Sequence, residues 1–169
     1  MSYDFNADNI LEMAELIERN GAKFYRTSAD SVQDPPSKEL LKGLAAMEDQ
    51  HEKTFASMRA ALTEKEKEST TFDPENESIR YLKALADSRV FVERQIPELS
   101  ALRGKPDKEI MEEILKFAIG AEKESIIFYL GMKDIVPESL GKDKLDDIIK
   151  EEMSHIRMLS NRLVSIKRG

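Results

Sequence analysis

The sequence contains no cysteine and no tryptophan, and only seven glycines and six prolines occur among its 169 residues. Without cysteine it can form no disulfide, no thiolate zinc site and no cysteine-ligated iron–sulfur cluster, and it has no cysteine nucleophile. The scarcity of glycine and proline disfavours a β-sandwich, a collagen-like chain and a disordered tail. No apolar run approaches the roughly 18 residues that cross a bilayer, and the acidic residues 1–8 do not resemble a secretory signal. We therefore expect a cytoplasmic protein without a membrane partner.

Basic residues are also in the minority. The chain has 26 Lys and Arg against 33 Asp and Glu, which gives a net charge of -7. This balance argues against a nucleic-acid partner. Charged residues are 35% of the chain and apolar residues 40%, which suits long amphipathic helices around one core. The length favours a single domain spanning residues 1–169.

Helix breakers cluster at four places and leave four long uninterrupted windows. The windows are 6–30, 37–66, 107–133 and 142–167. Each could form a helix of about 37 Å at 1.5 Å per residue, and Ser37 is a candidate N-cap for the second window. The connection 67–106 contains a weaker helical segment from Glu75 to about Glu93, and no stretch alternates as a strand would. The predicted fold is therefore all-α, with hairpins about 6–66 and 107–167 and a crossover about 67–106.

Each window carries an apolar stripe with the 3-4 spacing of a helix that packs in an antiparallel bundle. In the middle of every stripe a glutamate occupies a core position at which a helical bundle usually has leucine. Two of the windows also have a histidine one turn later. These residues are Glu18, Glu48 with His51, Glu122, and Glu152 with His155. Glu122, Glu152 and His155 lie 104 residues after Glu18, Glu48 and His51, respectively. This constant offset indicates a duplicated hairpin. The long crossover would place the second and third windows parallel to each other.

Carboxylates buried in an apolar seam must be neutralised, paired or bound to a metal ion. Four carboxylates balance the charge of two divalent ions, and neutral imidazoles complete the shell. Residues three apart on a helix are neighbours, so each Glu-x-x-His can reach one metal centre. One Glu from each of two helices, with Glu-x-x-His from each of the other two, is the donor set of carboxylate-bridged di-iron and di-manganese bundles. Two alternatives remain: solvated helix-face charges, and a duplicated bundle that binds no metal.

At these residues the chain resembles the rubrerythrin-like branch of the ferritin-like di-iron carboxylate superfamily. The resemblance rests on four strings: residues 18–25 (ERNGAKFY), 47–51 (MEDQH), 122–129 (EKESIIFY) and 151–155 (EEMSH). It implies a ferritin-like four-helix bundle with a long crossover that contains a short helix. It also implies that Glu48 and Glu152 bridge two iron ions (Fe2+/Fe3+, with manganese as an alternative).

By the same resemblance, Glu18 and His51 complete the ligand set of one ion, and Glu122 and His155 complete that of the other. Tyr25 and Tyr129 would lie near the site and hydrogen-bond its carboxylates; plain core aromatics are the alternative.

The chain departs from this family in two respects. Rubrerythrins carry a cysteine-ligated rubredoxin module, which a sequence without cysteine cannot form, so the electrons would come from an external donor protein. They also have an extra ligand Glu one turn after the third-helix Glu, where this chain has Ser125. In addition, the chain ends about one turn past the seam, without the fifth helix that ferritin cages have, so we do not expect a storage shell.

The leading functional prediction is a di-iron oxidoreductase that reduces hydrogen peroxide or O2. The first alternative is an iron-binding or ferroxidase protein without a cage, and the second is a non-catalytic, metal-dependent interaction bundle. The expected partners are the small oxidant, the electron donor protein and a second copy of the chain in a homodimer. The crossover segment is expected to pack on the bundle; a lid or a dimer contact is the alternative.

Overall fold

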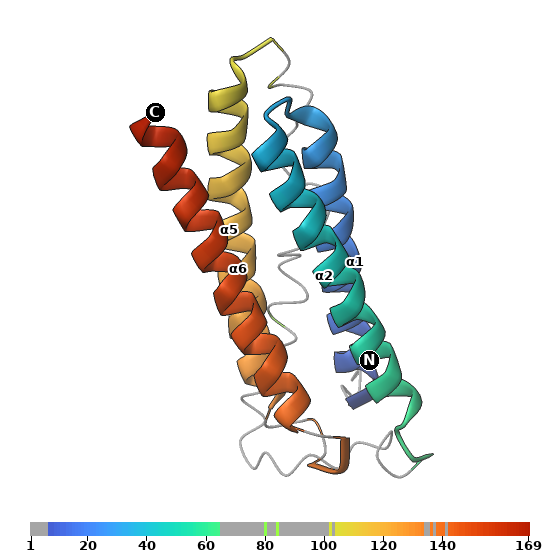
Figure 1. Cartoon of the computed structure of the whole chain (residues 1–169). Coiled ribbons are helices and arrows are strands. Elements are labelled where there is room, and N and C mark those ends of the chain that lie inside the picture. Colours follow the sequence, from blue (N-terminus) through green and yellow to red (C-terminus); the bar gives the residue numbers. More distant parts are fainter. Residues whose placement is uncertain are drawn as a thin grey trace.

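Four long α-helices form the computed structural model, which describes residues 7–64, 104–133 and 142–169 and the isolated positions 80, 84, 102, 136 and 138–140 (Figure 1). The helices are α1 (Ala7–Ser31), α2 (Pro35–Ala60), α5 (Asp107–Met132) and α6 (Lys142–Arg168), with the short 3-10 helix η2 (Glu138–Leu140) before α6. No strand occurs among the described residues. The all-α four-helix prediction is therefore confirmed. The predicted helix at Glu75–Glu93 lies outside the described residues, except for positions 80 and 84.

The helix bounds follow the breakers and the apolar stripes closely, with two corrections in α2. It ends at Ala60, short of the end of the predicted window 37–66, and it begins before that window. Ser37 is not the N-cap: Asp34 is, and its carboxylate accepts a hydrogen bond of 2.9 Å from the Ser37 backbone N–H. The helix begins two residues early because Pro35 and Pro36 suit a first turn, where a backbone N–H would have no intrahelical partner. Arg162 of α6 donates to Asp34 and to the Ser37 hydroxyl, so it connects the end of α6 to the start of α2.

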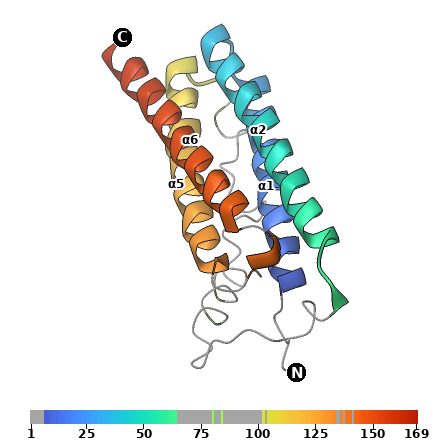
Figure 2. The ribbon, with the colours of Figure 1, turned by 60° about the horizontal axis from the view of Figure 1, so that its bottom comes forward.

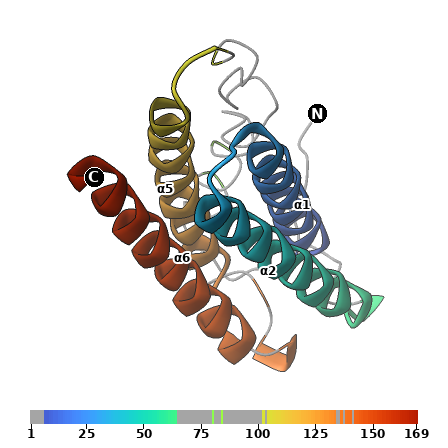
Figure 3. The same cartoon turned by 45° about the horizontal axis from the view of Figure 1, so that its top comes forward.

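The chain forms two antiparallel hairpins that lie side by side. α1 packs along α2 and α5 along α6, and Figures 2 and 3 show the two pairs as separate halves of one bundle. In Figure 1, α2 and α5 run in the same direction, as the long crossover predicts. None of the helices in the described part of the chain has the length and apolar character that a membrane span requires.

The core consists of two apolar clusters at different heights in the bundle. One includes Leu11, Phe55, Met132 and Ile148. The other includes Leu41, Leu44, Met111, Leu115 and Leu159. In α1, α2, α5 and α6 alike, the glutamates of the stripes lie between the residues of one cluster and those of the other. The fold therefore places a polar layer in the middle of an apolar interior.

Candidate metal centre

The structure brings together all six residues that the sequence singles out as metal ligands. Each comes from the middle of its helix, and none is more than 4% exposed. They are Glu18 on α1, Glu48 and His51 on α2, Glu122 on α5, and Glu152 and His155 on α6. The four stripes face inward because the apolar residues on either side of each glutamate are buried in the two clusters. The solvated-charge alternative is therefore wrong for these six residues.

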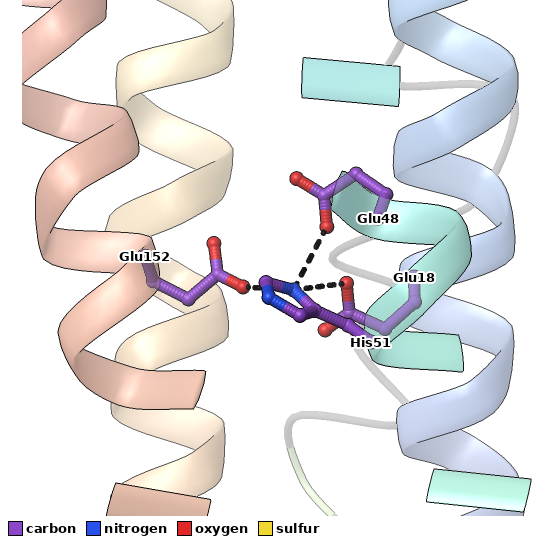
Figure 4. A group of neighbouring side chains, drawn as sticks. All are labelled: Glu18, Glu48, His51 and Glu152. Carbon is purple, nitrogen blue, oxygen red and sulfur yellow. Dashed lines mark ion pairs between the residues drawn. The ribbon is translucent and has the colours of Figure 1, made fainter. Parts of the chain in front are cut away.

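His51 lies against three carboxylates through one ring nitrogen. Its Nδ1 is 2.9 Å from Oε1 of Glu152, 3.4 Å from Oε2 of Glu18 and 3.5 Å from Oε2 of Glu48. Figure 4 shows the His51 ring between Glu152, which reaches across from α6, and the two glutamates of its own hairpin. The Nδ1 edge of the ring thus faces the centre of the cluster.

His155 repeats this arrangement in the other half of the bundle. Its Nδ1 is 3.1 Å from Oε2 of Glu152, 3.3 Å from Oε1 of Glu48 and 3.4 Å from Oε1 of Glu122. The two imidazole rings are stacked, with centroids 5.7 Å apart.

Two of the carboxylates divide their oxygens between the histidines. Glu152 presents Oε1 to His51 and Oε2 to His155, and Glu48 presents Oε2 to His51 and Oε1 to His155. Glu18 faces only His51, and Glu122 only His155. The ligand atoms thus fall into two groups that share Glu48 and Glu152, and within each group they lie within 4.8 Å of one another. The cluster thus provides two adjacent groups of potential ligand atoms that share two carboxylates.

Two buried tyrosines link the hairpins at Glu18 and Glu122, the outer carboxylates that each face one histidine. The Tyr25 hydroxyl donates to Glu122, and the Tyr129 hydroxyl donates to Glu18. Each tyrosine therefore holds a glutamate of the opposite half. Burial and the nearby carboxylates raise the pKa of both phenols well above its ordinary value, so both stay protonated as donors.

The four carboxyl groups fall into two kinds by the direction in which their pKa is shifted. Burial and the charge of Glu48 raise the pKa of Glu18 well above its ordinary value, and burial and the neighbouring Glu152 carboxylate do the same for Glu122. Burial would raise the pKa of Glu48 and Glu152 as well, yet the pKa of each is lowered, because the neighbouring Glu18 or Glu122 carboxyl and both imidazoles favour the ionised form and outweigh burial. Burial and charge therefore favour protonation of Glu18 and Glu122, the outer carboxyls that each face one histidine, and ionisation of Glu48 and Glu152, the shared carboxyls that each face both.

The same carboxylates also shift the pKa of the two imidazole rings. Burial alone would lower the pKa of each ring, but the facing carboxylates outweigh it; they raise the pKa of His155 to about 12 and hold the pKa of His51 well above its ordinary value. Two imidazolium ions then balance two carboxylates. Two divalent ions would balance four carboxylates and two neutral imidazoles equally well, so the cluster is matched in charge to two such ions.

The hydrogen-bond pattern of the cluster fits metal ions better than protons. Among the described residues, seven buried side-chain N or O atoms have no hydrogen-bond partner, and six of them belong to this cluster. They are Oε1 of Glu48, both carboxylate oxygens of Glu152, Nδ1 of His51 and both ring nitrogens of His155. Several of these atoms lie at ion-pair distance from one another without hydrogen-bond geometry. Atoms that converge in this way, without bonding one another, suit an ion between them.

One residue of the site was missed by sequence reasoning. Glu151, next to Glu152 on α6, lies 2.6 Å from Nε2 of His51 through its Oε2. The consecutive glutamates before Met153 are visible in the sequence, but the apolar stripe selects only the second as inward-facing. Ser125, where the family has an extra glutamate, is 6% exposed, and its hydroxyl donates to the Ala121 carbonyl on its own helix.

Comparisons with known proteins identify a matching family model and a matching fold. The sequence model of the Rubrerythrin family matches residues 9–163. A crystal structure described as a ferritin-like diiron-carboxylate protein from Thermotoga maritima superimposes with a TM-score of 0.69 at 24% identity, over 96% of this chain and 97% of that one. This likeness shows that the bundle has the ferritin-like fold. No curated protein matched the chain.

Proposed function

This chain belongs to the rubrerythrin family, and on that premise we propose that it binds two iron ions in the buried cluster and reduces hydrogen peroxide or O2. One observation carries the proposal: Glu48 and Glu152 each present one oxygen to each of the two histidines. A site for a single ion would need no such division. The similar Thermotoga maritima protein, described as diiron-carboxylate, supports iron as the metal.

The residues take distinct parts in this proposal. Glu18 and His51 would hold one ion, and Glu122 and His155 the other, while Glu48 and Glu152 would bridge them. When bound, two iron ions supply two electrons and Lewis acidity for the reduction. Tyr25 and Tyr129 keep the outer carboxylates oriented through their hydroxyl hydrogen bonds.

The surroundings of the site favour a small substrate. The cluster is buried between two apolar clusters, so a bulky molecule would have to displace core side chains such as Leu44 or Phe55. Reduction of hydrogen peroxide takes two electrons and two protons and releases two water molecules. A sequence without cysteine holds no cysteine-ligated iron–sulfur centre, so we propose that an external donor protein supplies the electrons.

The test is anaerobic loading with Fe2+, metal analysis, and then addition of hydrogen peroxide or O2 while the optical spectrum is recorded. We expect two iron ions per chain, and peroxide consumption that continues when a reductant is supplied. Glu152→Gln should lose this activity, whereas Glu113→Gln, on the exposed face of α5, should keep it. Uptake of many iron atoms per chain would point instead to ferroxidation. A firmly held manganese or zinc pair without turnover would overturn the oxidoreductase proposal.

A further inference from the structure

The two histidines differ at the ring edge that faces away from the cluster. Nε2 of His51 lies 2.6 Å from Oε2 of Glu151, which reaches it from α6. Nε2 of His155 is buried and has no hydrogen-bond partner among the described residues. The inner edges of the two rings are alike, since each Nδ1 faces three carboxylates. The near-symmetry of the cluster therefore breaks at the outer nitrogens.

The internal repeat explains this difference. The repeat pairs position 151 of α6 with position 47 of α2, because the offset is 104, and residue 47 is methionine. A thioether is a weak acceptor at best, whereas a carboxylate accepts strongly from an imidazole N–H. The duplicated hairpins have thus kept their metal ligands but differ at the position that would support the second histidine.

A carboxylate on Nε2 fixes how His51 can act. An ionised carboxylate can only accept, so Nε2 carries the hydrogen and, in the neutral ring, Nδ1 is left with its lone pair toward the cluster. Partners of this kind fix the tautomer and orientation of a metal-binding histidine and make it a stronger ligand. His155 needs the same tautomer to bind through Nδ1, but its buried Nε2–H would then have no partner in the described part of the chain, which is costly.

Glu151 also lies partly in solvent beside the buried His51. Its side chain is 53% exposed, whereas the side chain of His51 is 2% exposed. A cavity of about 490 Å³ lies beside both residues, between α2 and α6. Asp147 lines this cavity one turn before Glu151, but it pairs with Lys150 at 3.4 Å. The outer edge of His51 thus borders this cavity, and Glu151 is the carboxylate positioned on its ring.

We propose that Glu151 is a positioning residue that makes the two metal positions unequal, so that the position on His51 takes up metal first and holds it more tightly. The inference rests on the proposed two-metal function, which assigns both histidines as ligands. It adds an order of filling to that function.

The test follows the two histidines separately while metal is added. Because the chain has only two histidines, long-range 1H–15N spectra of 15N-histidine-labelled protein resolve both rings, and His155→Gln assigns them. Zn2+ is the probe, since it is diamagnetic and does not change oxidation state. At one equivalent per chain, we expect Nδ1 of His51 to show the metal-bound shift while His155 keeps its metal-free signals. Competition with a chelator then gives the two dissociation constants.

Four variants distinguish a positioning role of Glu151 from an effect of its charge on metal affinity. Glu151→Ala should weaken the tighter site about 10- to 100-fold, the usual effect of removing such a partner, and should abolish the order of filling. Glu151→Gln keeps an acceptor on Nε2 and should restore part of the affinity. Asp147→Ala removes the same charge from the same cavity without contact to His51, and should change the tighter site less than about threefold. Met47→Glu, which places a carboxylate at the corresponding position of the repeat, should tighten the weaker site.

The outcomes distinguish this inference from the function on which it rests. Simultaneous filling of both positions in the wild-type protein, or His155 filling first, would overturn the inference and leave the two-metal site intact. If Glu151→Ala and Asp147→Ala weakened the tighter site equally, Glu151 would act only through its charge. That result would also overturn the inference. Binding of fewer than two Zn2+ per wild-type chain would refute the two-metal site itself. Far-UV circular dichroism of each metal-free variant confirms that the fold is retained.

Discussion

Glu48 and Glu152 each face both histidines, whereas Glu18 and Glu122 each face one. The four glutamates occupy equivalent places in their stripes, so the apolar stripes alone do not distinguish a shared carboxylate from an outer one. The difference arises because Glu48 and Glu152 lie on the helices that also carry the histidines.

Substitution of one shared and one outer glutamate should therefore give different metal contents. In Glu48→Gln, one carboxylate of both groups is lost, and we expect at most one firmly held ion per chain. In Glu18→Gln only the His51 group is damaged, so one ion should remain with His155. Glu39→Gln, on an exposed turn of α2, should retain two ions. Metal analysis after desalting measures all three. Two firmly bound ions in Glu18→Gln would show that α1 supplies no ligand.

The tyrosines should act across the hairpins. Tyr129→Phe removes the donor to Glu18, so it should weaken the ion on His51, whereas Tyr25→Phe removes the donor to Glu122 and should weaken the ion on His155. We expect a loss of about 10- to 100-fold in affinity for the ion concerned. Each change should also lower the stability of the metal-free protein by about 1 kcal/mol, the usual net worth of one hydrogen bond.

The same histidine-labelled spectra measure this effect for each ion separately. Weakening of the ion in the same half as the tyrosine, Tyr129→Phe acting on His155 for example, would contradict the crossed arrangement.

At the scale of single helices, the start of α2 joins three parts of the bundle. Asp34 caps the helix through the Ser37 backbone N–H, and Arg162 reaches it from the last turns of α6. Asp107, at the start of α5, accepts hydrogen bonds of 3.0 Å from the backbone N–H groups of both Gln33 and Asp34. The loop between α1 and α2 is thereby held by the second hairpin, far from the metal centre.

The cap at Asp34 should stabilise the protein in a way that depends on pH. Hydrogen bonds from Ser37 and the charge of Arg162, against some burial, lower the pKa of Asp34 below its ordinary value. A carboxyl whose pKa is lower in the folded state stabilises it above the unfolded pKa, about 3.9, and that contribution is lost as the pH falls through the folded value. Asp34→Ala should cost about 1 kcal/mol at pH 7, and the cost should shrink below about pH 4.

Asp34→Asn isolates the charge, because asparagine is also a good N-cap. Since the Asp34 side chain is 40% exposed, solvent screens its pairing with Arg162, and Asp34→Asn should cost only a few tenths of a kcal/mol at pH 7. Urea unfolding of the three proteins at pH 3.5 and 7 measures both effects. A difference between wild type and Asp34→Ala that grows toward acid pH would contradict the assignment.

At the scale of the whole molecule, the sequence predicts the four helices well because both of its signals are local. Proline and glycine end helices through their own backbone geometry, and a 3-4 stripe identifies the inward face of a helix without reference to its neighbours. The six-residue cluster follows from these signals, since a glutamate at the centre of each stripe can only point into the bundle. The predicted window 6–30 accordingly corresponds to α1 (Ala7–Ser31).

The contacts between helices could not be predicted from these signals. Glu151 meets His51, and Tyr25 meets Glu122, because of the rotation and axial position of one hairpin against the other. The sequence contains no local signal for either quantity. The asymmetry of the two histidines was hidden for the same reason: position 47 differs from position 151 in the aligned repeat, but only the assembled bundle shows that this position contacts a histidine.

The polar layer between the apolar clusters should make the stability of the whole bundle depend on metal. Six buried atoms of the layer have no hydrogen-bond partner, and this cost offsets part of what the tyrosine hydrogen bonds contribute to holding the hairpins together. Ions that bind the folded cluster and not the unfolded chain stabilise it by about 2.7 kcal/mol per site at a free concentration 100 times the dissociation constant. For a protein of this size, that corresponds to a rise in melting temperature of about 5 to 11 °C for each site.

Thermal unfolding in chelator, in Mn2+ and in anaerobic Fe2+ measures this rise. Glu48→Gln should show a much smaller rise, since it disrupts both positions, while Glu39→Gln should match the wild type. Each histidine substitution should reduce the rise, but His51→Ala should reduce it more than His155→Ala, because the position on His51 is the one that Glu151 supports. Equal melting temperatures in chelator and in saturating metal would mean that the cluster is held by protons alone, and the proposed two-metal site would have to be abandoned.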